Sequence, residues 1–129
     1  MNMKTGTSEK QIANVLKVLG SPFRVKLIYE IGRSEACVCH LEAVLKKRQA
    51  YISQHLMVLR DAEILETRRE GKYIFYRIAD ESIFDLLAAA GGVQQIPANQ
   101  LPNIAEPGAH DNCHCPKCEP EPAQDILSE

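Results

Sequence analysis

The residues of this 129-residue chain best suited to chemistry are its five cysteines, which fall into two groups. Cys37 and Cys39 form a Cys-x-Cys pair, and three more lie near the C-terminal end: Cys113, Cys115 and Cys118. Residues 1–10 are polar and lack the apolar stretch of a secretion signal, so we expect a cytoplasmic protein whose thiols stay reduced. The cysteines therefore indicate metal binding or redox chemistry rather than a disulfide framework.

The Cys37/Cys39 pair precedes a short amphipathic segment, at the start of a predicted helix. A helix amino terminus lowers the pKa of a thiol, and thiolates are the form that binds soft metals or reacts with oxidants. Two thiolates do not complete a typical site, because cadmium, lead or zinc takes three or four donors. The pair is therefore a candidate sensing site that needs a further ligand; the alternative is that both cysteines simply pack in the core.

The C-terminal cysteines are the obvious source of that ligand, together with His110 and His114. Three arrangements are open. This segment completes the Cys37/Cys39 site in the same or the opposite subunit, binds a separate ion, or is an accessory thiol cluster. A complete zinc ribbon is disfavoured, because there is only one Cys-x-x-Cys motif, Cys115 to Cys118.

Basic residues are concentrated in one part of a chain whose net charge is only -2. Eight lysines and arginines lie between Lys46 and Arg77, opposed there by only four acidic residues, whereas many of the other acidic residues lie towards the C-terminal end. This distribution is typical of a protein with one face against a polyanion. The alternative is an ordinary solvated surface.

The elements that would position these residues follow from apolar periodicity and capping signals. A capping box at Ser8 to Gln11 predicts a helix that ends at Gly20, and Ser21-Pro22 begins a second helix that ends at Gly32. A brief helix around residues 41–45 ends in a basic run, and another extends over residues 49–62. Residues 64–78 read as a β-hairpin around Glu70-Gly71. A last helix begins with a cap at Asp80 or Ser82 and ends at Gly91-Gly92, with an apolar face suited to a partner subunit.

Two short helices followed by a basic hairpin predict a mainly α fold with a small β-hairpin, a winged helix-turn-helix in which the second helix enters the major groove of DNA. The side chains placed to read bases or bind phosphates are Arg48, Gln49, Tyr51, Ser53, Gln54, Arg68, Arg69 and Lys72. His55 lies in the same helix, where a structural or DNA-side role is favoured over metal ligation.

The chain divides into residues 1–95, a DNA-binding and dimerisation domain, and residues 96–129, a mobile tail. Six of the seven prolines lie beyond residue 95, where large apolar residues are few, so we expect no packed core there. The longest apolar run, residues 86–90, is far too short to cross a membrane.

The sequence resembles the ArsR/SmtB family of winged-helix metalloregulatory repressors over residues 9–92. The segments that carry the resemblance are residues 18–24, 37–41, 49–56, 59–62 and 68–72. The resemblance implies a homodimer that binds an imperfect inverted repeat of double-stranded DNA and is released by a toxic metal, a metalloid or a thiol-modifying signal. It also implies a three-thiolate site for arsenic or antimony. As(III) or Sb(III) is therefore the favoured inducer, ahead of cadmium, lead and zinc.

Two departures from the family pattern concern the site itself. His40 replaces the usual aspartate after the second cysteine, which weakens a helix cap and adds a candidate ligand, and Arg48 replaces the usual serine before the recognition-helix glutamine. The predicted last helix lacks the histidines of the family's second zinc site. This argues against a zinc sensor of that kind.

The function predicted from these observations is a repressor whose binding to DNA is controlled through Cys37 and Cys39. One alternative is a repressor that senses thiol oxidation or persulfides, in which one of these cysteines links to a tail cysteine. Another is a metal-buffering or protein-interaction module that does not bind DNA. An enzyme is disfavoured, because no nucleophile, base and orienting group recur at a recognisable spacing.

Overall fold

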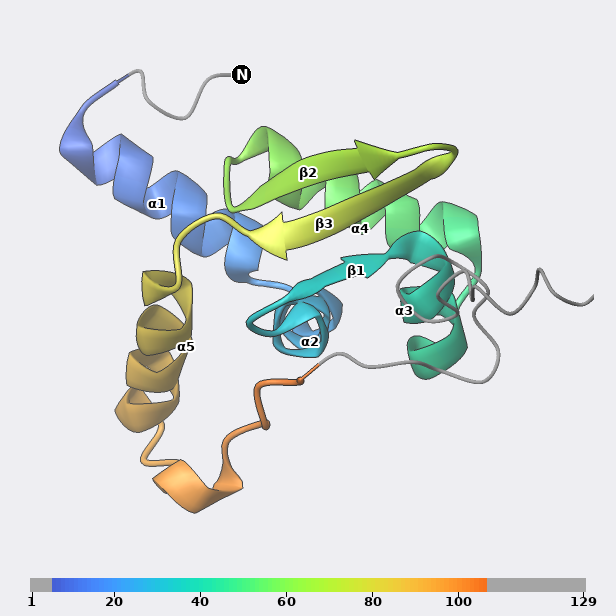
Figure 1. Ribbon diagram of the computed structural model, residues 1–129. Helices are drawn as coiled ribbons and strands as arrows, with labels where there is room; N and C mark the ends of the chain where they lie inside the picture. Colours follow the sequence, from blue (N-terminus) through green and yellow to red (C-terminus); the bar gives the residue numbers. More distant parts are fainter. Residues whose placement is uncertain (1–5, 107–129) are drawn as a thin grey trace, which may run out of the picture.

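The computed structural model describes residues 6–106, which form a helical body with one small sheet (Figure 1). The helices are α1 (Ser8–Leu19), α2 (Pro22–Ile31), α3 (Val38–Leu45), α4 (Gln49–Asp61), α5 (Ser82–Val93) and a short 3-10 helix, η1 (Ala98–Gln100). The strands are β1 (Glu35–Cys37), β2 (Leu65–Glu70) and β3 (Tyr73–Ile78). The predicted winged helix-turn-helix is confirmed, with α3 and α4 as its helix pair and β2–β3 as the wing.

The first two helices begin and end at capping residues. Thr7 caps α1 by accepting the Lys10 N–H at its hydroxyl oxygen (3.3 Å), so the helix starts one residue earlier than a cap at Ser8 would place it. The second prediction is confirmed: Ser21 accepts the Arg24 N–H, Pro22 is the first residue of α2, and the helix ends before Gly32.

The sheet contains one strand that the sequence pattern did not reveal. The strand order is β1-β3-β2, with both pairings antiparallel, and β1 places Cys37 opposite Phe75. Three residues are too few to display the alternation by which strands are recognised. As a result Cys37, expected at the start of a helix, is both the N-cap of α3 and the last residue of a strand hydrogen-bonded to the wing.

The last helix runs through the glycines that were expected to end it. It continues to Val93, and the left-handed residue that follows the helix is Gln95 (φ 62°). A Cβ atom at Gly91 would lie 2.8 Å from the Leu101 side chain. Gly91 therefore allows the returning chain to approach α5 rather than stopping the helix.

The core lies where α2, α3 and α4 meet beneath the sheet. Its fully buried aliphatic side chains are Leu27, Ile28, Ile31, Leu41, Ile52, Leu56 and Leu59. After α5 the chain returns to α2, where the Ala105 N–H donates to the Tyr29 carbonyl oxygen (2.9 Å) and Ile104 packs against the core. The domain boundary at residue 95 stays a prediction, because residues 107–129 lie outside the described part of the chain.

Figure 1 shows α1 and α5 at one side of the molecule, and α3 with the tip of the wing at the opposite side. Within residues 6–106 no helix has the length and apolar character needed to span a membrane.

Candidate nucleic-acid interface and thiol site

The turn between α3 and α4 is built from the basic run. Lys46 adopts the left-handed conformation (φ 56°, ψ 45°) and its N–H donates to the Glu42 carbonyl oxygen, which ends α3. Arg48 then begins α4 in an extended conformation without a side-chain capping bond. The first N–H groups of α4 therefore have no side-chain cap and lie beside three cationic residues, an arrangement suited to a phosphate.

Helix α4 presents a polar face opposite its buried one. Ile52, Leu56 and Leu59 anchor it in the core. Of the residues predicted to contact DNA, Arg48, Gln49 and Gln54 are exposed, Ser53 is half-buried and Tyr51 is 42% exposed. The structure therefore places the predicted reading residues of α4 at the surface.

An aromatic cluster holds α4 against the start of α2. The Tyr51 ring lies 4.7 Å from the His55 ring and 4.9 Å from the Phe23 ring, centroid to centroid. The His55 Nδ1 accepts a hydrogen bond from the Arg24 Nε (3.1 Å), and Arg24 also donates to the Val18 carbonyl oxygen (2.8 Å). Burial and the Arg24 charge lower the pKa of His55. His55 thus has a structural role, one of the two roles that the sequence favoured over metal ligation.

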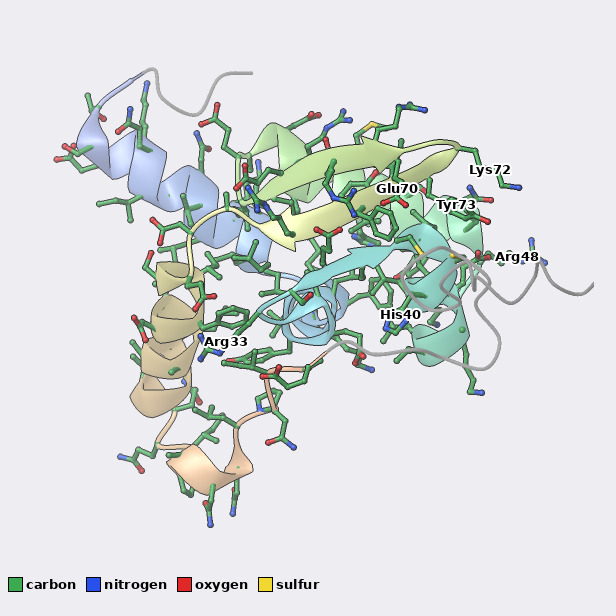
Figure 2. The ribbon with its side chains drawn as sticks, viewed as in Figure 1. Arg33, His40, Arg48, Glu70, Lys72 and Tyr73 are labelled. Carbon is green, nitrogen blue, oxygen red and sulfur yellow. The ribbon has the colours of Figure 1, made fainter. Side chains whose placement is uncertain are left out.

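The three basic residues predicted at the wing tip have different surroundings. The turn consists of Gly71, which adopts a positive φ of 62°, and Lys72. Lys72 and Arg48 both lie at the wing-tip end of the molecule (Figure 2), and Arg69 is exposed on β2. Arg68 is different, because it forms ion pairs with Glu35 and with Glu70 (3.0 Å to the latter).

The two cysteines meet at the junction of β1 and α3. Cys37 is the N-cap of α3, its sulfur accepting the His40 N–H at 3.4 Å, and it is only 2% exposed. Cys39 is half-buried, and the two sulfur atoms lie 2.7 Å apart. The pair packs against Phe75 and Tyr73 of β3. Both sulfurs therefore lie on the same side of the start of α3.

A cleft of about 330 Å³ joins the thiols to the DNA-reading helix and to the wing. We call it the thiol cleft. Its lining residues are Cys37, Val38, Cys39, Glu42, Gln49, Ser53, Lys72, Tyr73, Ile74 and Tyr76. Any group attached to Cys39 therefore enters a space bounded by two residues predicted to read bases and one predicted to bind phosphate.

The donors for a metal are incomplete within the described residues. The two sulfurs are near enough to bind one soft ion together, but residues 6–106 contain no group of three or more His, Cys, Asp or Glu side chains arranged to hold one. His40, a candidate ligand, is buried (6% exposed) at the third residue of α3. Cys113, Cys115 and Cys118, with His110 and His114, lie outside the described part of the chain.

Comparison with known proteins identifies relatives of the same architecture. Residues 21–67 match a family model described as bacterial regulatory protein, arsR family. The chain is 41% identical over 91 residues to a biofilm growth-associated repressor of Agrobacterium fabrum, covering 70% of this chain and 78% of that protein. It is 34% identical over 80 residues to a cadmium resistance transcriptional regulatory protein CadC homolog of Staphylococcus aureus, covering 61% and 66%.

A solved structure extends the likeness to the fold. The chain superposes with a TM-score of 0.60 and 27% identity on the homodimeric winged helix-turn-helix DNA-binding domain Mb0332 of Mycobacterium bovis, covering 70% of this chain and 89% of that one. The chain thus shares the fold of a solved winged helix-turn-helix DNA-binding domain.

Proposed function

Because the chain belongs to the arsR family of bacterial regulatory proteins, we propose that it is a DNA-binding transcriptional repressor released from its operator when a soft metal or metalloid binds Cys37 and Cys39. Its matched relatives are transcriptional regulators, which confirms the prediction that the chain is not an enzyme. A cytoplasmic location stays a prediction.

The observation that carries this proposal is the thiol cleft. Cys37 and Cys39 share it with Gln49 and Ser53 of α4 and with Lys72 of the wing. An ion held by the two sulfurs, with its further ligands, occupies space between the elements that must fit the duplex. We expect the ion to displace α4 relative to the wing. A coupling free energy of about 1–3 kcal/mol between ion and DNA would weaken DNA binding roughly 5- to 150-fold, which suffices for release from the operator.

The DNA contacts divide by position. In the proposed complex α4 lies in the major groove, where Gln49, Tyr51, Ser53 and Gln54 reach base edges. Arg48 and the uncapped start of α4 bind a backbone phosphate, and Arg69 and Lys72 of the wing bind flanking phosphates.

The proposed repressor acts as a homodimer on an imperfect inverted repeat. Apolar side chains are exposed on α1, where Ile12 and Leu16 are 59% and 51% exposed, and after the glycines of α5, where Val93 is 78% exposed. A related domain is homodimeric. Two copies paired through this side would set their α4 helices about one DNA turn, roughly 34 Å, apart.

As(III) is the favoured inducer, followed by cadmium, lead and zinc. The CadC homolog among the relatives supports a metal-responsive assignment. A third donor is proposed to come from the cysteines of the tail, which lie outside the described residues. The tail cysteines could also bind a separate ion or form an accessory thiol cluster, and the experiment below tests whether they belong to the Cys37/Cys39 site.

The test measures DNA affinity with and without arsenite, cadmium or lead, using a duplex that the protein selects from a random pool. We expect at least one of these ions to weaken the affinity of the wild type by 5- to 150-fold, and Cys37→Ser and Cys39→Ser to bind DNA but lose the response. A variant with Cys113, Cys115 and Cys118 all replaced by serine tests the tail with the same chemical change. If this variant loses the response, the tail cysteines belong to the sensing site; if it keeps the response, they do not.

Other outcomes distinguish the alternatives. If all three ions leave the affinity of the wild type unchanged, the metal-sensor assignment is wrong. A response to hydrogen peroxide instead, with a disulfide between Cys37 or Cys39 and a tail cysteine found by mass spectrometry, would establish the redox-sensing repressor. Absence of salt-dependent DNA binding would favour the metal-buffering or interaction module.

A further inference from the structure

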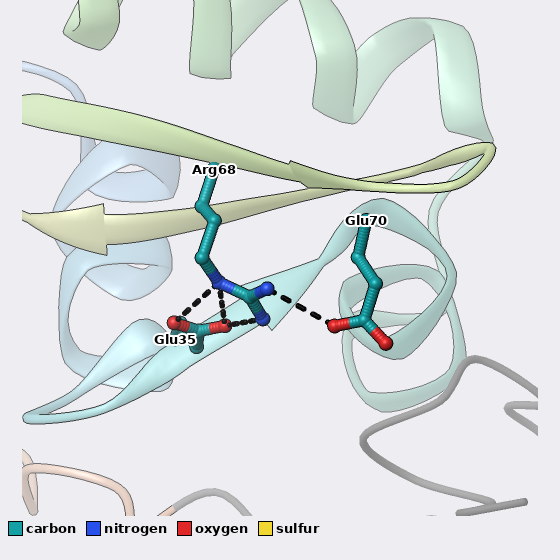
Figure 3. Close-up of polar contacts among 3 residues, drawn as sticks. All are labelled: Glu35, Arg68 and Glu70. Atoms are coloured by element: carbon teal, nitrogen blue, oxygen red, sulfur yellow. Dashed lines mark hydrogen bonds and ion pairs between the residues drawn. The ribbon is translucent and has the colours of Figure 1, made fainter.

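Arg68 has a different environment from the other basic residues of the wing. Its guanidinium donates to the carboxylate of Glu35, including a 3.0 Å bond from Nε, and to the carboxylate of Glu70 at 3.0 Å (Figure 3). It also lies over the Phe75 ring, 4.6 Å from the centroid. The side chain thus bridges β1, β2 and β3, although it is half exposed.

The register of the sheet connects this bridge to the thiols. Phe75 of β3 pairs with Cys37 on one side and with Arg68 on the other. Directly paired residues project from the same face of a sheet, so Cys37, Phe75 and Arg68 form one row across it. Phe75 is 1% exposed and packs on Cys37, while the Arg68 guanidinium covers the ring.

The charges at this position oppose contact with a phosphate. One guanidinium faces two carboxylates, so the group of Glu35, Arg68 and Glu70 carries a net charge of about -1 at neutral pH. The interaction with both carboxylates raises the pKa of Arg68 further, so its protonated form is retained. To bind a phosphate, Arg68 would have to leave both partners and expose Glu35 to the same polyanion.

We propose that Arg68 is a positioning residue that couples the state of the Cys37/Cys39 pair to the position of the wing, and that it does not bind the DNA backbone. This inference rests on the proposed function. A shift of Cys37 is transmitted through Phe75 and Glu35 to Arg68 and so to β2. Exposed ion pairs contribute little to stability, so we assign the bridge a geometric role.

The first measurement is the dependence of DNA affinity on salt in three full-length variants: Arg68→Gln, Glu35→Gln and Arg69→Gln. Arg69 is the matched control, because successive side chains alternate between the faces of a strand and Arg69 therefore projects away from Glu35. Removing the interaction of one cationic side chain with a phosphate reduces the slope of log K against log salt by about one. We expect that reduction for Arg69→Gln and an unchanged slope for Arg68→Gln.

The second measurement is the rate at which iodoacetamide alkylates Cys37 and Cys39, followed by mass spectrometry with and without the selected duplex. If Arg68 couples the thiols to the wing, DNA bound at the wing changes the surroundings of the thiols and with them their rate of alkylation. We expect DNA to change the alkylation rate severalfold in the wild type and in Arg69→Gln. In Arg68→Gln and Glu35→Gln that change should be lost. The variant that combines both substitutions should behave like either single variant, because both residues belong to one bridge.

The outcomes separate the two proposals. A salt slope reduced by about one in Arg68→Gln, or a DNA-dependent alkylation change that survives in Arg68→Gln, overturns the role of Arg68 and leaves the repressor function intact. A wild type whose alkylation rate is the same with and without bound DNA overturns the coupling itself. A wild type that does not bind DNA overturns the proposed function.

Discussion

The imidazole of His55 must be neutral at Nδ1 to accept its hydrogen bond from Arg24. Protonation would place a second positive charge beside the guanidinium, in a site also packed by Phe23 and Tyr51. Burial, followed by the Arg24 charge, accordingly holds the pKa of His55 below its ordinary value of 6.5.

This lowered pKa predicts a pH dependence of stability. The unfolded chain binds a proton at position 55 more readily than the folded protein does, so the stabilisation is present above about pH 6.5 and is lost as the pH falls below that value. We expect the Tm of the wild type to fall between pH 7 and pH 5. His55→Gln keeps an acceptor but does not titrate, and should show a smaller fall over the same range, measured by thermal unfolding followed by circular dichroism. Equal falls in both proteins would contradict this assignment.

At the scale of single residues, the sequence identified side chains by chemical type but not by partner. Cys37 and Cys39 were singled out from their spacing together with the family resemblance, and the structure brings their sulfurs together. By contrast, the pairing of Arg68 with Glu35 joins positions 33 residues apart in the chain. A lysine- and arginine-rich run shows that a face is basic, but only tertiary contacts show which cations are already neutralised.

Helices and their caps were the most predictable elements, because their signals are local. Ser21-Pro22 and the apolar spacing of α4 mark those helices in the local sequence. The sequence predictions failed for elements whose existence or end depends on contact with a distant segment of the chain. Strand β1 exists because β3 provides its hydrogen-bonding partner, and α5 passes Gly91 because Leu101 returns to pack against that glycine.

The end of α2 at Gly32 is a position where adding one methyl group is expected to destabilise the protein. Its φ of 65° and ψ of -145° form a conformation that residues with a Cβ atom disfavour. A Cβ at this position would also lie 2.0 Å from the Ala105 carbonyl oxygen. Gly32→Ala should therefore lower the free energy of unfolding by about 2 kcal/mol or more. It should also detach the segment that returns to α2.

Gly92→Ala is the matched control, because it lies within α5 and an added Cβ meets no atom within 4 Å among the described residues. That substitution should be neutral or stabilise the protein by roughly 0.5–1 kcal/mol. Urea unfolding of both variants provides the comparison. Similar stabilities for the two would show that contact with Ala105 does not constrain Gly32.

The whole molecule separates its surfaces by chemistry. Figure 1 shows α3, the start of α4 and the wing tip towards one side of the molecule and α1 towards the other. The first group carries the basic turn and lines the thiol cleft, and α1 carries the exposed Ile12 and Leu16. Charge distribution predicted the basic surface from the sequence. The apolar surface was predicted on the last helix, whereas Ile83 and Phe84 of α5 are buried and the exposed Ile12 and Leu16 lie on α1. The shared cleft was not predictable, because it is formed by α3, α4 and the wing only after they pack.

This separation predicts that dimerisation can be removed without unfolding the protomer or altering its reading helix. Ile12 and Leu16 lie one helical turn apart on α1 and are largely exposed in the protomer, so Ile12→Glu combined with Leu16→Glu introduces charges that an apolar interface must desolvate. We expect this variant to be monomeric in sedimentation equilibrium and to keep the circular dichroism spectrum of the wild type. Its affinity for an inverted repeat should be at least tenfold weaker, because each protomer then binds one half-site independently. Met57→Glu, at a position of α4 that is also 51% exposed, controls for the added charge and should leave the oligomeric state unchanged. If the α1 variant stays dimeric, the exposed face of α1 is not required for pairing, and the spacing of the two reading helices must be set by another surface.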